Sequence, residues 1–392
     1  MLINFIDDNQ PSIPIVIVAG REALALWLKD QSDRVKNWVL VTGFEPNSGS
    51  TCLIANGSGN VEMVLGGTGD KDLSNLWMWS SMRNDLPGGI YRLDASLNDE
   101  EATQAALGWA LAGYKFDLYS TSGSEKYGPI LVWPKNCDRE HVNRTVQATF
   151  LVRDLINTPA NDMGPEQLAD CAQTLAQEFN AEFSVIVGEE LLEANYPAIH
   201  AVGRASANAP RLVDMQWGKH ADPKVTLVGK GVCFDTGGLD LKQSSGMRLM
   251  KKDMGGAAHV LGLASMIMAA ALPIRLRVLI PAVENSVSGN AMRPLDVITM
   301  RDGKTVEIGN TDAEGRLILA DALSAACDES PKVLIDMATL TGAARVALGT
   351  DLPALFCNDD AFASDLEAHA KIQSDPIWRL PLWKPYEKMI EG

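Results

Sequence analysis

Basic residues are few in this sequence and do not collect into runs. Its 34 lysine and arginine residues are outnumbered by 50 aspartate and glutamate residues, which gives a formal net charge of -16. A protein that binds nucleic acid normally presents a basic face. The charge balance therefore argues against a nucleic-acid partner and is typical of an acidic, soluble protein.

Cysteine and histidine are also scarce. The six cysteines are scattered, and no two of them form a CxxC pair. This pattern is typical of reduced, mostly buried thiols in a reducing compartment. The five histidines form no ligand pair such as HExxH, so a metal site in this chain would be rich in oxygen ligands.

The sequence lacks a hydrophobic run long enough to cross a membrane. Its longest apolar stretch, 261–272, ends at Pro273 and is shorter than the ~20 residues that a membrane span needs. The first residues, Met1–Asp8, contain no basic region of the kind that opens a signal peptide. We therefore expect a cytoplasmic protein with no membrane partner.

The chain is long enough for two domains, because 392 residues exceed the ~250–300 at which a single core usually stops growing. Short β-rich runs alternating with loops and a helix predict an N-terminal α/β domain over 1–138. Apolar positions on one face predict a helix over Arg139–Asn157, ended by Thr158-Pro159, which makes 139–160 a linking helix between the domains. The predicted strands of the first domain are Ile13–Ala19, Trp38–Thr42, Thr51–Ala55, Val61–Leu65 and Ile130–Trp133.

A second α/β domain is predicted over 161–392. Its apolar strands, at Val225–Val228, Leu276–Ile280 and Val333–Ile335, alternate with helical stretches. This alternation indicates a mainly parallel central sheet flanked by helices. Ligands of such sheets bind at the carboxyl ends of the strands.

Charged residues gather just after the first of these strands. A glycine-rich turn follows Val228 and carries Lys230 and Asp235, and Lys242 comes soon after. Asp253 precedes an apolar helix, where we expect it to act as the N-cap. A cap and a metal ligand are compatible roles.

The segment Asn310–Leu317 carries two acids and an arginine at another predicted helix start. Thr311 and Glu314 fit the S/T-x-x-E capping box, which leaves Asp312 and Arg316 unexplained. Together with Asp235 and Asp253, these acids make four carboxylates at strand-to-helix junctions. Four acids suffice for two divalent ions roughly 3.5–4 Å apart when one or two of them bridge. Such a site suits manganese, magnesium or zinc, so the metal stays open.

The segment NTDAEGRL at 310–317 is supported by VGKGxxFDxGGxxxK at 228–242 and MxxDMGGAA at 250–258. Through these motifs the chain resembles the M17 leucine aminopeptidase family, the cytosolic leucyl aminopeptidases. The resemblance implies a metal-dependent aminopeptidase that uses a two-metal-activated water, with a broad, leucine-like preference for the N-terminal residue of peptides. It also implies a homohexamer and a further segment after the part that matches Pro381–Gly392, so we expect a C-terminally shortened member.

Residue roles follow from the same resemblance. It implies that metal ions are bound by Lys230, Asp235, Asp253, Asp312 and Glu314, with Asp235 and Glu314 bridging. It implies that Lys242 stabilises the developing oxyanion and that Arg316 holds a bicarbonate ion that shuttles a proton. The residues implied to contact the substrate are Met250, Thr339, Leu340 and Gly342.

Two alternatives stay open. Some members of the family bind DNA as regulatory or architectural factors without need of catalysis, although the charge of -16 disfavours that role here. The same acids also suit another two-metal hydrolase, such as a phosphoesterase. A leucyl anilide and an aryl phosphate distinguish the two hydrolases.

Overall fold

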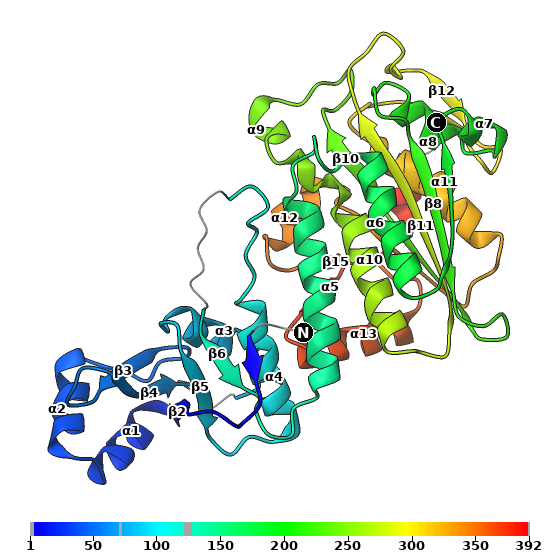
Figure 1. Ribbon diagram of the computed structural model, residues 1–392. Coiled ribbons are helices and arrows are strands. Elements are labelled where there is room, and N and C mark those ends of the chain that lie inside the picture. Colours follow the sequence, from blue (N-terminus) through cyan, green and yellow to red (C-terminus); the bar gives the residue numbers. More distant parts are fainter. Residues whose placement is uncertain (1–3, 70–72, 121–127, 391–392) are drawn as a thin grey trace. The chain divides into compact units, whose positions relative to one another are not determined.

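The computed structural model describes residues 4–69, 73–120 and 128–390 and has two compact units, 1–147 and 148–392 (Figure 1). The division falls inside helix α5 (Arg139–Asn157), whose bounds agree with the predicted helix. The expected two-domain α/β fold is confirmed. Among the described residues, none of the helices combines the length and apolar character that a membrane span requires.

The first unit contains a six-stranded sheet in the order β1-β6-β5-β2-β4-β3. All its neighbouring strands are parallel except the edge strand β3, which runs antiparallel to β4. The strands are β1 (Phe5–Ile6), β2 (Ile13–Val18), β3 (Thr51–Ala55), β4 (Val61–Gly67), β5 (Ile90–Asp94) and β6 (Ile130–Val132). The helices are α1 (Gly20–Lys29), α2 (Asp33–Thr42), α3 (Leu76–Asn84) and α4 (Asp99–Leu111).

The predicted strand at Trp38–Thr42 is wrong, because these residues form the second half of α2. The Ser32 side chain accepts a hydrogen bond from the Val35 backbone and caps the helix. Val35 and Val39, one turn apart, are the residues that α2 buries. A short β-branched run thus resembled a strand although its buried positions follow the helical period.

The second unit contains a sheet in the order β14-β9-β11-β8-β7, with β10 also pairing with β11. Strands β14, β9, β11 and β10 are mutually parallel, whereas β8 and β7 run antiparallel to their neighbours. The sheet is therefore mixed, with a parallel centre. Its strands are β7 (Glu182–Val187), β8 (Arg211–Trp217), β9 (Lys224–Gly229), β10 (Gly231–Asp235), β11 (Arg275–Asn285) and β14 (Val333–Met337).

Two small sheets and a set of helices complete this unit. The small sheets pair β12 (Val297–Thr299) with β13 (Thr305–Glu307), and β15 (Ala354–Leu355) with β16 (Trp378–Arg379). The helices are α6 (Pro165–Glu178), α7 (Glu190–Glu193), α8 (Pro197–Gly203), α9 (Ser244–Met247), η1 (Met250–Met254), α10 (Gly255–Ala269), α11 (Glu314–Cys327), α12 (Gly342–Leu348), α13 (Asp360–Ile372) and η2 (Lys384–Met389).

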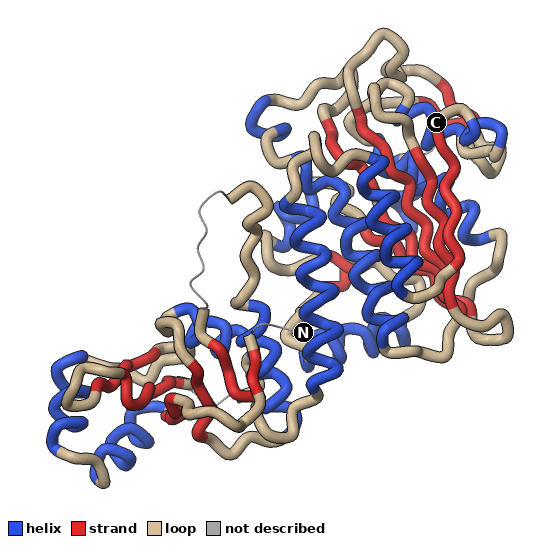
Figure 2. The backbone as a smooth tube through the Cα atoms, viewed as in Figure 1, coloured by secondary structure: helices blue, strands red, loops and turns tan. Residues whose placement is uncertain are grey.

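Helices cover both faces of the six-stranded sheet of the second unit (Figure 2). Val278 and Ile280 of β11 are buried in one core with residues of α6 and α10. Leu279, between them, is buried in a second core with residues of α8 and α11. Successive side chains of a strand point to opposite faces, so a strand buried on both sides reads as a continuous apolar run.

The carboxyl end of the sheet is closed tightly by the start of α10. A β-carbon on Gly256 would lie 2.0 Å from the carbonyl oxygen of Met337, so only glycine fits at this approach. Across the same gap the Ala257 amide donates to the Lys230 carbonyl at 2.9 Å. This packing fixes the backbone of Lys230 between the ends of β9 and β14.

Candidate metal centre

The predicted metal ligands all lie at the carboxyl edge of the parallel strands. Lys230 joins β9 to β10, and Asp235 is the last residue of β10. Asp253 belongs to η1, Glu314 begins α11, and Asp312 lies in the loop before it. Residues more than eighty positions apart are brought together because the strands end at one edge.

Lys230 is buried between two carboxylates. Its Nζ lies 2.8 Å from Asp253 Oδ2 and 3.0 Å from Glu314 Oε1, and all three side chains are 3% exposed or less. The same Nζ donates to the Thr339 carbonyl at 3.1 Å. Breaking a buried ion pair by removing one partner typically costs about 3–5 kcal/mol, so these charges depend on one another.

Lys242 pairs with the remaining two acids. Its Nζ lies 2.8 Å from Asp235 Oδ2 and also contacts Asp312 Oδ1. The Lys242 amide donates to the Thr236 carbonyl at 2.9 Å, which folds the glycine-rich turn back toward the cluster. The turn therefore places Lys242 over the end of its own strand.

The charged groups of this cluster shift one another's pKa values. Burial acts to lower the pKa of Lys230, but the carboxylates of Asp253 and Glu314 outweigh it and raise the pKa above its usual value. Burial acts to lower the pKa of Lys242, but the hydrogen bonds that its ammonium group donates to Asp235 and Asp312 outweigh this effect and raise the pKa. Burial raises the pKa of Glu314 to about 7, with Lys230 opposing the rise and Asp235 adding to it. The carboxylates around both lysines therefore favour their protonated forms.

These residues fit divalent metal ions. One carboxylate oxygen from each of Asp235, Asp312 and Glu314 lies within 4.8 Å of the others. Glu314 Oε2 is buried and accepts no hydrogen bond from the described part of the chain, which is costly for an oxygen that has no ion to bind. Four carboxylates also face three ammonium groups of the described residues, those of Lys230, Lys242 and Lys252, the last at 3.6 Å from Asp253 Oδ1, so negative charge is still in excess.

Both capping predictions are wrong. Helix α10 has Met254 at its N-cap with no side-chain cap, because the Asp253 carboxylate faces Lys230 instead. Helix α11 has Ala313 at its N-cap, also without a side-chain cap. The Thr311 hydroxyl donates to the Gly237 carbonyl at 2.6 Å, so it ties two loops together rather than opening a helix.

The structure adds contacts that the motifs do not reveal. The Thr339 hydroxyl donates to Asp253 Oδ1 at 2.8 Å, so this predicted substrate residue also contacts a predicted ligand. Asn285, which sequence reasoning missed, donates to Asp235 Oδ1 at 2.9 Å. Its position at the end of an apolar strand beside β10 is the signal that could have found it.

The other predicted residues lie outside this network. Arg316 is exposed on the first turn of α11 and forms no ion pair with any described residue. Met250 begins η1 and is half-buried. Leu340 and Gly342 are exposed around the start of α12, after the end of β14. Within the described ranges, no side-chain hydrogen bond or ion pair joins these four residues to the carboxylates.

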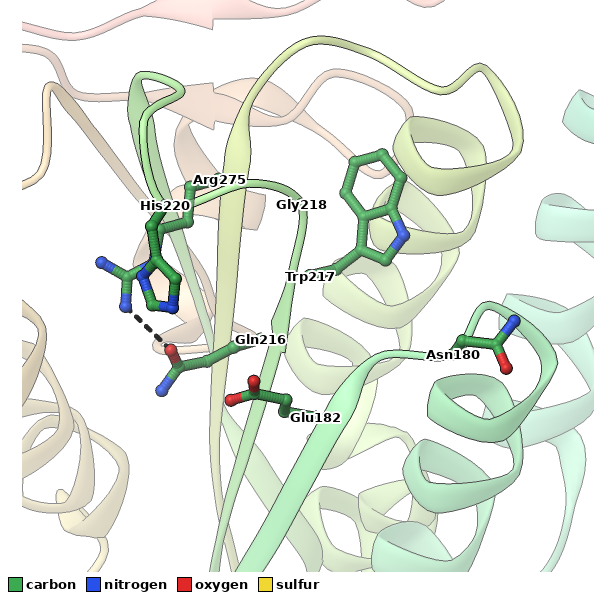
Figure 3. A pocket seen from close by; sticks show the side chains of 7 residues that line it. All are labelled: Asn180, Glu182, Gln216, Trp217, Gly218, His220 and Arg275. Atoms are coloured by element: carbon green, nitrogen blue, oxygen red, sulfur yellow. Dashed lines mark hydrogen bonds between the residues drawn. The ribbon is translucent and has the colours of Figure 1, made fainter.

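A separate small hollow of about 100 Å³ lies at the opposite edge of the sheet (Figure 3). It is lined by Asn180, Glu182, Gln216, Trp217, Gly218, His220 and Arg275. Arg275 donates to Gln216 Oε1 at 2.9 Å, the dashed contact in the figure. The hollow adjoins the amino ends of β7 and β11, so it contains none of the predicted site residues.

Fold and site together define a two-unit α/β protein with a carboxylate-rich centre suited to divalent metal ions. The family model for the cytosol aminopeptidase family, catalytic domain, matches residues 150–392. The model for the M17 aminopeptidase N-terminal domain matches 13–132. The chain belongs to the cytosol aminopeptidase family, M17, whose members depend on metal ions.

Several relatives are similar over much of the chain. Peptidase B of Pectobacterium carotovorum is 46% identical over 71% of this chain and 66% of its own length. A probable cytosol aminopeptidase of Agrobacterium fabrum is 40% identical over 79% of this chain and 63% of its own length. The chain thus spans just under two thirds of the length of each of these relatives.

Solved structures extend the comparison to the whole fold. The cytosol aminopeptidase from Coxiella burnetii superposes with a TM-score of 0.93 and 46% identity, over 99% of this chain and 84% of that one. The bottromycin maturation enzyme BotP in complex with Mn has a TM-score of 0.85 and 31% identity, over 97% and 84% of the two chains.

Proposed function

We propose that this protein is a metal-dependent aminopeptidase that removes the N-terminal residue from peptides, with a broad, leucine-like preference. The observation that carries the proposal is the buried cluster in which Lys230, Lys242 and four carboxylates converge at one edge of the sheet. Membership of the cytosol aminopeptidase family supports it.

Two divalent ions would be held by Lys230, Asp235, Asp253, Asp312 and Glu314, with Asp235 and Glu314 as the bridging ligands. When bound, such ions activate a water molecule and polarise a carbonyl group. Lys230 would be a ligand only as a neutral amine, because an ammonium group has no free lone pair. The structure of the manganese complex of a related enzyme makes manganese the first metal to test, with zinc and magnesium beside it.

Lys242 would supply a fixed positive charge. Its ammonium group pairs with Asp235 and Asp312, so it lies beside two of the residues that would hold the ions. It would then face the negative charge that develops on the oxygen of the scissile carbonyl, the usual task of such a group. Exposed Arg316 would hold a bicarbonate ion, which would supply a group for acid–base chemistry beside the metal centre.

Substrate contacts are assigned to Met250, Thr339, Leu340 and Gly342. An apolar pocket of this kind discriminates by only ~1–3 kcal/mol per methylene, which is the reason to expect broad specificity. Assembly into a hexamer and a cytoplasmic location stay predictions that the family membership favours.

The proposal is tested with metal-free protein supplied in turn with manganese, zinc and magnesium. We expect hydrolysis of a leucyl anilide, with an aryl phosphate left intact, and loss of activity on addition of a strong chelator. Hydrolysis of the phosphate alone would instead support a different two-metal hydrolase. Full peptidase activity in verified metal-free protein would contradict the proposal.

A further inference from the structure

Asn285 lies at the meeting point of the segments that carry the clustered acids. It is the last residue of β11 and is 2% exposed. Its Nδ2 donates to Asp235 Oδ1 at 2.9 Å and to the Thr311 carbonyl at 3.1 Å. A side-chain amide nitrogen has two hydrogens, so both are used, one on each segment.

The contact with Asp235 determines which carboxylate oxygen faces the cluster. Asp235 Oδ1 accepts from Asn285 and, at 2.8 Å, from the Gly237 amide. The other oxygen, Oδ2, faces Lys242 Nζ. Two donors on one oxygen hold the carboxylate in a single orientation, with Oδ2 directed to the charged groups.

The contact with Thr311 determines the position of the second segment. Thr311 is fully buried, and Asp312 and Glu314 follow it directly in the chain. The Asn285 carbonyl also accepts from the Thr236 amide at 3.0 Å and from its hydroxyl at 2.8 Å. One rigid residue at a strand end therefore anchors both the glycine-rich turn and the loop before α11.

We propose that Asn285 is a positioning residue of the metal centre, which sets the distance between Asp235 and the Asp312–Glu314 segment through the two hydrogens of one amide group. The inference rests on the proposed function insofar as the cluster binds metal ions. Leucine has nearly the same shape as asparagine but no hydrogen-bond donor. In an Asn285→Leu variant, the carboxylates of the two segments would therefore no longer be held at the spacing that a metal ion needs. Such outer partners of metal ligands typically contribute 10–100-fold to metal affinity or activity.

The experiment is a calorimetric titration of metal-free Asn285→Leu protein with manganese and with zinc, after circular dichroism has established that it is folded. We expect metal affinity to fall by about 10–100-fold. The matched control is Ser206→Ala, which removes a hydrogen bond to Glu284, the neighbour of Asn285 on the same strand. Adjacent strand residues face opposite ways, so the control disturbs the same strand end but should bind metal like the wild type.

Equal affinity in folded Asn285→Leu and wild-type protein would overturn the proposal, as would an equal loss in the Ser206→Ala control. If the leucine variant does not fold, Asn285→Ala is measured by the same criterion, since its smaller side chain creates no clash. Wild-type protein that binds metal but hydrolyses no peptide would refute the aminopeptidase function while leaving the role of Asn285 measurable. A variant with normal affinity in an active peptidase would refute the role of Asn285 alone.

Discussion

Gly315 and Lys230 are packed so closely that a β-carbon on Gly315 would lie 2.5 Å from Lys230 Cε. Gly315 is the second residue of α11 and follows Glu314, whose carboxylate pairs with the same lysine. The helix thus begins with an acid that binds the lysine and a glycine that makes room for it.

Gly315→Ala should therefore displace the Lys230 side chain without removing a ligand. Within a helix, alanine is favoured over glycine by about 1 kcal/mol. If the substitution left the site undisturbed, it would therefore raise the free energy of unfolding. We expect instead a metal affinity lower by at least about tenfold and a lower melting temperature, measured by calorimetry. Gly309→Ala is the control, because no atom lies within 4 Å of its added β-carbon; the same loss there would contradict the packing argument.

Lys230→Arg should cost the protein one of the two metal ions that we propose it binds. Arginine keeps the positive charge but stays protonated under any working condition, so it cannot become a neutral ligand. We expect turnover of a leucyl substrate to fall on the order of 100-fold or more, with metal content measured by mass spectrometry. Lys219→Arg, on an exposed residue, should change neither quantity. Normal metal content and turnover in Lys230→Arg would remove Lys230 from the site.

Replacing Lys242 should affect turnover but not metal content, unlike replacing the acids. Asp312→Ala and Glu314→Ala remove predicted ligands, so both should lose metal together with turnover. Lys242→Ala should keep near-normal metal content and lower mainly kcat, by about 100–1,000-fold, as expected for a group that acts on the transition state. If Lys242→Ala loses as much metal as the two acid variants, the role proposed for Lys242 is wrong.

Metal uptake should release protons and strengthen as pH rises. The pKa of Glu314 is raised by burial to about 7, so below that pH an ion must displace its proton. The pKa of Lys230 lies above its usual value, so this group must lose a proton at any pH near neutrality. We expect release of about one proton at about pH 8 and a larger number at about pH 6, from calorimetry in buffers of different ionisation enthalpy. Uptake without proton release at the higher pH would show that Lys230 keeps its proton and is not a ligand.

Where the pattern of the chain is local and long, the sequence by itself determined the structure. Helix α5 repeats apolar positions over five turns, and its predicted bounds match the observed Arg139–Asn157. The motifs likewise identified the family, because NTDAEGRL places its residue types at fixed spacing. The short run at Trp38–Thr42 failed because five residues do not distinguish a strand from half a helix.

The pairing of the charged groups was decided only by the tertiary structure. Thr311 and Asp253 have the sequence pattern of helix caps, yet Thr311 bonds to a loop more than seventy residues away and Asp253 faces Lys230. Asn285 carries no motif, and its two contacts exist because β10 and β11 end at the same edge of the sheet. Local sequence patterns predict contacts between residues within one helical turn. Strand register and helix packing, in contrast, determine which side chains from distant parts of the chain meet.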